Sequence, residues 1–287
     1  MADPLDDETV TMRGAIDLEI GRPDSGDSGF VSGLYDTLAF WLASFCFVLI
    51  TFGWSLCAAF IVWLLPRRIG TRVGQWGIMV CFRIQVAVMG LTGRIFCDVS
   101  ELDALRADGG LVIAPNHPSL LDVVLVTSRL SRVTCIMKAN LWDNVLLGGG
   151  ARLARYIRND SPSGMVKLAV DEIRRGSQLL VFPEGTRTVH RPVNRFKGGF
   201  ALIAQRAGVP VQTVFIETNS PFLGKGWPVW RRPAMPLCYR VRLGRRFTVS
   251  GDVKAFSTML EAYFENEMRV RSEARSGCAG QEPPGED

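Results

Sequence analysis

A histidine and an aspartate five residues apart are the side chains of this sequence best suited to general base chemistry. His117 follows an apolar run at residues 111–115, and Asp122 falls early in a helix-like segment that starts at residue 120. If the imidazole folds back onto the first helical turn, the carboxylate accepts a hydrogen bond from one ring nitrogen and leaves the other free to take a proton. The spacing therefore predicts a base and the carboxylate that orients it.

A second polar string, Phe-Pro-Glu-Gly-Thr-Arg at residues 182–187, follows another apolar run at residues 178–181. Both strings are expected where a buried strand ends, which is the edge at which open α/β sheets bind their ligands. Glu184 and Arg187 bring a carboxylate and a guanidinium to that edge, and a guanidinium suits an anionic substrate. Together the two strings predict a base that activates a hydroxyl group beside a clamp for an anion.

Structural roles also fit these residues. Ser119 and Asp122 match a capping box at a helix N-terminus, which is compatible with catalysis because a capped helix is a rigid mount. Glu184 and Arg187 could pair with each other at the surface, a contact worth about 0.5 kcal/mol. His190, the other histidine of the chain, falls in a polar loop and is expected to be solvated.

The two strings resemble the Asn-His-x4-Asp and Phe-Pro-Glu-Gly-Thr-Arg motifs of the glycerolipid acyltransferase family, typified by 1-acylglycerol-3-phosphate O-acyltransferases. The resemblance extends from about residue 111 to about residue 219 and includes Val-Pro-Val at residues 209–211. It implies that an acyl chain passes from a thioester, acyl-CoA or acyl carrier protein, to a hydroxyl of a lysolipid. It also implies that His117 is the base and Asp122 its orienting partner. The residues that would help to hold the acceptor phosphate are Glu184, Gly185, Thr186 and Arg187.

The family's middle motif is matched incompletely. In the family it ends in an arginine after an Ile-Asp pair, whereas residues 156–160 here read Tyr-Ile-Arg-Asn-Asp. Arg158 comes one position early, and Asn159 occupies the arginine position. Lys138, which ends a strand-like run, is a further candidate for the rim of the substrate site, with a solvated strand-end lysine as the alternative. The family resemblance favours 1-acylglycerol-3-phosphate as the acceptor. Because the middle motif is matched incompletely, a lyso-aminolipid or another specialised lipid is the alternative.

The predicted reaction is direct acyl transfer in phospholipid biosynthesis. The lysolipid hydroxyl gives its proton to His117 as its oxygen attacks the thioester, and Asp122 stabilises the imidazolium. No cofactor or metal is expected beyond the donor thioester. Two alternative functions are a thioester hydrolase, in which an anion clamp has little purpose, and an inactive membrane scaffold, against which the intact base, carboxylate and clamp argue.

An apolar run at residues 38–65 predicts a membrane anchor. As one helix it would reach roughly 42 Å, longer than the ~30 Å hydrocarbon core. Its late start and the acidic region before it disfavour a signal peptide. Gly53 leaves two geometries open, a tilted single span and a broken, re-entrant helix. Residues 73–91 are less apolar and are expected to lie in the interface or against the first helix, as the family resemblance also implies.

The charge distribution predicts an inner-membrane protein whose catalytic domain faces the cytoplasm. Residues 1–30 carry eight Asp or Glu and two arginines, whereas Arg67, Arg68 and Arg72 directly follow the anchor. Residues 225–246 hold seven Lys or Arg with two tryptophans, a composition typical of a membrane interface and also of a docking surface for an acidic carrier protein or the phosphates of CoA.

Other partner and metal classes are not indicated. A nucleic-acid partner is not expected, because no nucleic-acid motif accompanies the basic charge. The seven cysteines show no Cys-x2-Cys spacing, and their odd number indicates reduced, structural thiols.

These features divide the chain into an acidic disordered N-terminus at 1–30, a membrane anchor module at 31–95, an acyltransferase domain at 96–272 and a flexible tail at 273–287. The predicted domain is α/β, with a central mixed sheet and flanking helices after the N-terminal apolar helical anchor. Strands are expected near residues 111–115, 134–138, 178–182, 211–218 and 239–249. Helices are expected near residues 120–129, 163–175, 196–207 and 255–271.

Overall fold

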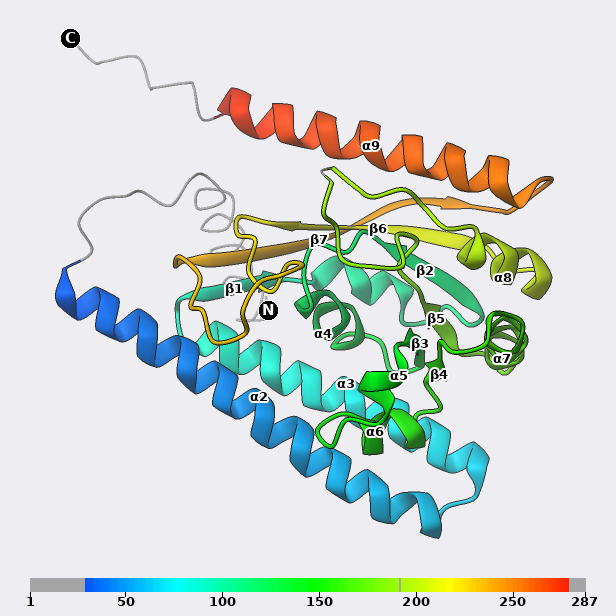
Figure 1. Cartoon of the computed structure of the whole chain (residues 1–287), viewed down its shortest axis with the longest axis horizontal. Coiled ribbons are helices and arrows are strands. Elements are labelled where there is room, and N and C mark those ends of the chain that lie inside the picture. Colours follow the sequence, from blue (N-terminus) through cyan, green and yellow to red (C-terminus); the bar gives the residue numbers. More distant parts are fainter. Residues whose placement is uncertain (1–28, 191, 279–287) are drawn as a thin grey trace, which may run out of the picture.

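The computed structural model describes residues 29–190 and 192–278 and shows an α/β domain resting on a long helical hairpin (Figure 1). The predictions of a disordered N-terminus and of most of the flexible tail lie outside the described residues. One sheet has the strand order β1-β7-β6-β2-β5-β3-β4. Its strands are β1 (Ile95–Asp98), β2 (Leu111–Pro115), β3 (Val133–Met137), β4 (Ile157–Arg158), β5 (Gln178–Leu180), β6 (Val211–Thr218) and β7 (Leu237–Phe247).

The sheet is mixed, as predicted. Strands β6, β2, β5, β3 and β4 run parallel to one another, whereas β7 pairs antiparallel with β6 and parallel with β1. Every residue of β2 is buried, which is the pattern of a strand covered on both faces. Parallel strands place their carboxyl ends at one edge, so the polar strings that follow β2 and β5 meet there.

Helices cover both faces of this sheet. Leu111 and Ile113 of β2 pack into one apolar cluster with α3 (Arg67–Leu91) and α4 (Leu121–Thr127). Val112 and Ala114 point the other way, because successive side chains of a strand alternate, and they pack with the second set of helices. This second set is α7 (Pro162–Arg174), α8 (Gly199–Ala207) and α9 (Val253–Cys278).

Several short elements were not predicted. They are β1, β4, the 3-10 helix η1 (Ser100–Leu105), α5 (Ala139–Trp142) and α6 (Gly148–Leu153). Elements of two to six residues are too short to show a hydrophobic period, so the sequence carries little signal for them.

The membrane module is a helical hairpin. Helix α2 (Phe30–Leu64) is continuous through Gly53, and the chain reverses at Leu65 and Pro66 into α3. Both helices are long and apolar enough to cross a membrane by length and composition. Helix α3 packs against α2, which is one of the two placements predicted for residues 73–91, and also against α4 and β1. The hairpin therefore lies along the α/β domain (Figure 1).

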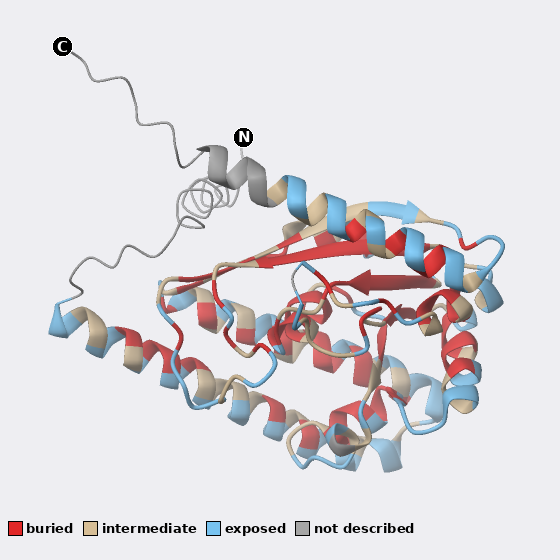
Figure 2. Cartoon of the chain, turned by 45° about the horizontal axis from the view of Figure 1, so that its top comes forward, coloured by how far each residue is buried: buried red, intermediate tan, exposed pale blue. Residues whose placement is uncertain are grey.

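The outer face of α2 is apolar and exposed. Trp41, Phe45, Phe60 and Trp63 are all more than half exposed. Figure 2 shows exposed residues along the side of α2 that faces away from the sheet. Large contiguous apolar surfaces are uncommon on soluble proteins and mark contact with lipid or another apolar partner. The hairpin thus offers one apolar face outward while α3 ties it to the sheet.

Glycines allow the hairpin to contact the domain backbone to backbone. Gly149 of α6 donates its N–H to Ser55 Oγ in α2 at 2.9 Å, and a Cβ at this position would lie 2.1 Å from the Ser55 carbonyl oxygen. Within the hairpin, Gly77 of α3 leaves no space either, because its Cβ would lie 2.1 Å from the ring of Trp54 in α2. A side chain at Gly149 must therefore push α2 away from α6, and one at Gly77 must push α2 away from α3.

We expect Gly149→Ala to lower the Tm of the detergent-solubilised protein by about 4 °C or more, since overpacking a contact costs about 1–3 kcal/mol. Gly53→Ala is the matched control: it lies in α2 with nothing within 4 Å of its Cβ, and alanine favours a helix over glycine. Equal Tm values for the two variants would show that α6 does not hold α2.

Candidate active site

His117 and Asp122 form the predicted hydrogen bond. His117 Nδ1 lies 2.8 Å from Asp122 Oδ2, and the Asp122 side chain is completely buried. The backbone N–H of Ser119 donates to the same carboxylate oxygen at 2.8 Å, while Ser119 Oγ accepts the N–H of Leu121 at 3.2 Å. The capping and orienting roles thus coexist, because Asp122 holds the loop and the imidazole with one oxygen.

The backbone before His117 is fixed by an asparagine. Asn116 bonds both atoms of its side-chain amide to Ile216 of β6, at 2.9 Å to the carbonyl oxygen and 2.7 Å to the nitrogen. This pairing continues the contact between β2 and β6 beyond Pro115, which has no N–H of its own. The imidazole then stacks on the ring of Phe182, with centroids 3.8 Å apart and planes 17° apart. Neither Asn116 nor Phe182 was given a side-chain role from the sequence.

These contacts define which ring nitrogen can act. Since Nδ1 faces the carboxylate, it carries the proton when Asp122 is ionised, and Nε2 is then the unprotonated nitrogen. Burial raises the pKa of Asp122 to about 6, although the hydrogen bond from His117 opposes that rise. The pair therefore combines an imidazole whose Nε2 can accept a proton with a buried carboxylate that is hydrogen-bonded to Nδ1.

Glu184 has a different place from the one predicted. Its side chain is buried, and Oε1 accepts the backbone N–H of His117 at 2.9 Å and the hydroxyl of Thr188 at 2.8 Å. Oε2 accepts the backbone N–H of Asn194 at 2.9 Å. Both oxygens are thus engaged within the protein, so Glu184 joins the two motif loops and does not face an anionic substrate. It does not pair with Arg187 either, because that side chain turns to another loop.

Arg187 holds the connection between β6 and β7. Its Nη1 donates to the carbonyl oxygens of Leu223 at 2.9 Å and Gly224 at 2.8 Å. Leu223 O also accepts the N–H of Leu120 at 3.1 Å, next to the His117–Asp122 pair, which we call the dyad. Within the described chain these carbonyls are the partners of the guanidinium, which leaves Nε and Nη2 to meet an anion. Arg187 is half-buried, and the anion clamp predicted for it stays a prediction.

Gly185 and Thr186 lie at the open side of the same loop. Gly185 is exposed and has φ = 68°, a left-handed conformation that favours glycine. A Cβ there would lie 2.9 Å from Nζ of Lys197, so the lysine side chain lies directly over the glycine. Lys197 is an exposed cation next to the motif. No sequence pattern indicated a role for it.

Lys138 and Arg158 lie farther along the sheet edge. Lys138 follows β3 and Arg158 ends β4, which are two and three strands away from β2. Both side chains are exposed, and Arg158 Nε pairs with Asp160 Oδ2 at 2.8 Å. The structure places them on the same carboxyl edge as His117, and Arg158 is engaged by its own neighbour.

A buried tyrosine supports the dyad from behind. Tyr239 of β7 donates its hydroxyl to Ser119 Oγ at 3.1 Å, and Ser119 Oγ donates to the carbonyl of Phe222 at 3.0 Å. Burial raises the pKa of Tyr239, so it stays a neutral donor. The sequence did not predict this series of hydrogen bonds from Tyr239 through Ser119 to Phe222, because the three residues are far apart in sequence.

Comparison with known proteins agrees with this site. Residues 97–217 match the family model described as Acyltransferase. Over 135 residues the chain is 28% identical to the chloroplastic 1-acyl-sn-glycerol-3-phosphate acyltransferase BAT2 of Brassica napus, covering 45% of this chain and 39% of that one. The region that carries the site is thus similar to acyltransferases that act on glycerolipids.

Two further relatives extend the comparison. The chain is 32% identical over 121 residues to the lyso-ornithine lipid O-acyltransferase of Pseudomonas aeruginosa, covering 38% of this chain and 46% of the relative. The match thus spans less than half the length of these curated relatives. The crystal structure of the 1-acyl-sn-glycerophosphate acyltransferase PlsC from Thermotoga maritima superposes with a TM-score of 0.58 at 19% identity, over 84% of this chain and 97% of that one, which shows a shared fold.

Replacing Glu184 by glutamine is expected to act on stability first. Glutamine offers one oxygen where the carboxylate offers two, and hydrogen bonds to a charged acceptor contribute about 1.5–3 kcal/mol. Glu184→Gln should therefore reduce the free energy of unfolding by about 2 kcal/mol and reduce kcat, with little change in the KM for the acceptor. The control is Asp143→Asn at an exposed carboxylate. A rise in acceptor KM without loss of stability would restore the substrate-binding role.

Acidification is expected to lower activity and to raise the contribution of Asp122 to stability. The raised pKa means that the native protein takes up a proton near pH 6 that the unfolded chain takes up only near pH 4. Between these values the native state binds more protons, so the contribution of this group to stability grows as pH falls through about 6. The protonated carboxyl no longer stabilises an imidazolium, so kcat/KM falls over the same range, with an apparent pKa that belongs to the pair.

Profiles of kcat/KM and Tm from pH 8 to pH 5 measure both effects. Asp122→Asn should remove this group's rise in stability and lower kcat/KM at every pH. A wild-type kcat/KM that stays constant down to pH 5 would contradict the assignment.

Proposed function

We propose that this chain transfers an acyl group from a thioester to a hydroxyl of a lysolipid at a membrane surface. The observation that carries the proposal is the contact between His117 and the buried Asp122, which leaves Nε2 to accept a proton. The match of residues 97–217 to the Acyltransferase family model supports acyl transfer as the reaction class, and the apolar face of α2 supports a lipid substrate.

The proposed reaction is a single displacement. Nε2 of His117 takes the proton of the acceptor hydroxyl while the hydroxyl oxygen forms a bond to the thioester carbonyl carbon. When the tetrahedral intermediate collapses, the carbon–sulfur bond breaks and the imidazolium returns the proton to the leaving thiolate. Asp122 stabilises the imidazolium between these steps, and the stacked ring of Phe182 keeps the imidazole plane fixed.

The acceptor we favour is 1-acylglycerol-3-phosphate. The remaining nitrogens of Arg187 and the ammonium of Lys197 give the open side of the motif loop positive charge for a phosphate. A lyso-aminolipid is the second candidate, on a specific observation: Asn159 replaces the family arginine, and Arg158 is paired with Asp160. The similarity to the lyso-ornithine lipid O-acyltransferase supports that alternative.

The assay uses membranes or purified protein with acyl-CoA or acyl carrier protein thioester and a panel of lysolipids, reporting free thiol and lipid product. We expect thiol release that requires an acceptor, and a loss of at least about 10³-fold in kcat for His117→Ala, since a general base and its partner contribute on this scale. His190→Ala, at the other histidine, should keep full activity. Thiol release without any acceptor would indicate a hydrolase, and no release with any acceptor would indicate a scaffold.

For the membrane, we propose that the hairpin lies along the bilayer surface with the outer face of α2 among the lipids. Arg67, Arg68 and Arg72 are exposed at the turn of the hairpin, where deep insertion would bury their charges. When the hairpin lies flat on the membrane, these arginines meet anionic headgroups, and the chain stays on the cytoplasmic side of the inner membrane. This placement differs from both geometries that the sequence left open, a tilted single span and a broken, re-entrant helix.

In this geometry residue 33 and the catalytic domain share one side of the membrane. A cysteine introduced at Gly33, in a background without the native thiols, should be shielded from an impermeant reagent in intact cells and labelled in inverted vesicles. Labelling in intact cells would favour a span.

A further inference from the structure

Helix α2 contains a single charged residue, Asp36, and this carboxylate is buried against the α/β domain. A charge in an otherwise apolar helix is costly unless it is paired. Asp36 Oδ1 lies 2.7 Å from Nε of Arg94, which directly precedes β1, and Oδ2 accepts a hydrogen bond from Nη1 of Arg232 at 3.3 Å. The carboxylate therefore joins the membrane hairpin to two segments of the domain that are far apart in the sequence.

The two arginines differ in how many other contacts hold them to α2. Arg94 Nη2 also donates to Ser32 Oγ at 2.9 Å, and its guanidinium carbon lies 5.5 Å from the ring centre of Tyr35. Among the residues that the structure describes, Asp36 is the one ionic or hydrogen-bonding partner of Arg232. Loss of the carboxylate contact would therefore release Arg232 from α2 but leave Arg94 attached.

Arg232 belongs to the β6–β7 connection, which at its other end contacts the segment between the two residues of the dyad. The carbonyl of Phe222 accepts the Ser119 hydroxyl at 3.0 Å, and that of Leu223 accepts the Leu120 N–H at 3.1 Å. Leu223 has φ = 54°, a left-handed conformation that is strained for leucine and persists where neighbouring contacts hold the backbone. A loosened connection would let this turn relax and move the carbonyls away from the dyad.

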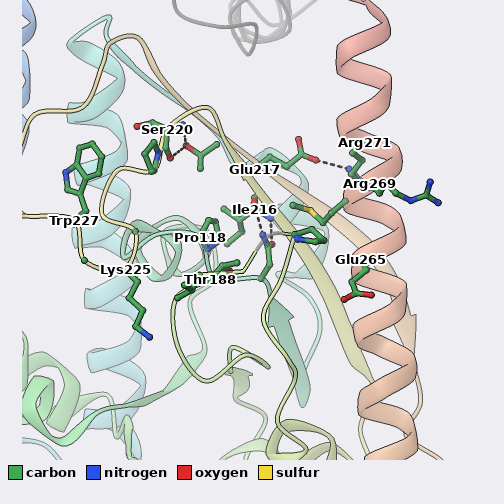
Figure 3. A pocket seen from close by; sticks show the side chains of 18 of the residues that line it. Pro118, Thr188, Ile216, Glu217, Ser220, Lys225, Trp227, Glu265, Arg269 and Arg271 are labelled. Atoms are coloured by element: carbon green, nitrogen blue, oxygen red, sulfur yellow. Dashed lines mark hydrogen bonds and ion pairs between the residues drawn. The ribbon is translucent and has the colours of Figure 1, made fainter.

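The connection also forms one wall of a cleft next to the dyad. The cleft has a volume of about 1200 Å³, and its lining includes Asn116 and Pro118, on either side of His117 in sequence. Figure 3 shows Lys225 and Trp227 of the connection on one side of Pro118 and helix α9 on the other. A displaced connection therefore also changes the shape of the space beside the dyad.

We propose that Arg232 is a positioning residue for acyl transfer, and that its ion pair with Asp36 lets the hairpin set the geometry of the dyad. The proposal rests on the proposed function, because it concerns the rate of that reaction. Asp36 fixes Arg232, Arg232 holds the connection, and the connection keeps its turn at Leu223 against the segment between the dyad residues. Arg232 thus acts through the dyad and not on the reacting atoms.

The first test compares Arg232→Gln with Arg94→Gln in the full-length, detergent-solubilised protein. Arg232→Gln should lower kcat about tenfold, since a small misplacement of catalytic groups is costly. It should keep its fold, because Phe40 still packs against Phe222 with ring centroids 5.8 Å apart. Arg94→Gln should lower the Tm by more than Arg232→Gln and lower kcat by less, because it loosens β1 and leaves the connection in place.

Three further variants show whether the ion pair itself is responsible. Arg232→Lys keeps a positive charge near Asp36 and should recover most of the lost kcat. Arg245→Gln, which removes an exposed arginine that lies over Phe247, should leave kcat unchanged. In Asp36→Asn/Arg232→Gln, kcat should be no lower than in the worse of the two single variants, since both changes break one contact.

Hydrogen exchange measured by mass spectrometry gives a reading that does not depend on activity. In Arg232→Gln the peptide that contains the Leu120 N–H should exchange at least about fivefold faster than in the wild type, because its acceptor on Leu223 is no longer held. Arg94→Gln should leave the exchange of this peptide unchanged.

Equal kcat in the wild type and Arg232→Gln, equal exchange at Leu120, or a double variant whose losses multiply would each overturn the proposal. Failure of the proposed function would look different. A wild-type protein that transfers no acyl group contradicts the reaction, whereas faster exchange at Leu120 in Arg232→Gln would still show that Arg232 positions the dyad.

Discussion

The buried carboxylate of Glu184 is the contact on which the geometry of this site depends. It accepts backbone N–H groups from His117 and Asn194 and a hydroxyl from Thr188, and so joins two loops that leave the sheet from different strands. A buried carboxylate is tolerated when donors surround it, and the donors here are mostly backbone groups that cannot move without moving the loops. The same network returns to its start, because Thr188 N donates to the carbonyl of His117 at 2.7 Å.

The membrane hairpin is part of the same assembly. Phe40 of α2 packs edge-on against Phe222, with ring centroids 5.8 Å apart, and the carbonyl of Phe222 accepts the hydroxyl of Ser119 beside the dyad. Asp36, buried in α2, pairs with Arg94 at 2.7 Å and with Arg232 at 3.3 Å, at the far end of the same connection. The β6–β7 connection is therefore held at one end by the hairpin and at the other by Arg187. Helix α2 therefore also positions the loop that lies behind His117 and Asp122.

The sequence predicted the elements whose signal is local. Residues 111–115 and 211–218 were predicted as strands and are strands, and the spacing of His117 and Asp122 predicted their hydrogen bond. The role of Glu184 could not be predicted in this way, because the sequence shows a carboxylate but not which backbone N–H groups donate hydrogen bonds to it. Hydropathy predicted the membrane module but not its reversal, although Pro66 disfavours helix at the residue before it. No sequence signal assigned a role to Gly149 and Gly150, because the residues of α2 that they contact, Ser55 and Trp54, are far away in the sequence.

The central claim is that Asp122 holds His117 in the tautomer that leaves Nε2 unprotonated. The chain has two histidines, so the protein labelled with ¹⁵N-histidine and carrying His190→Gln reports His117 alone in an NMR spectrum. At pH 8 we expect a protonated Nδ1, an unprotonated Nε2, and a downfield Nδ1 proton whose signal is lost in Asp122→Asn as the tautomers mix. An Nε2-protonated imidazole, or a spectrum that Asp122→Asn leaves unchanged, would contradict the account.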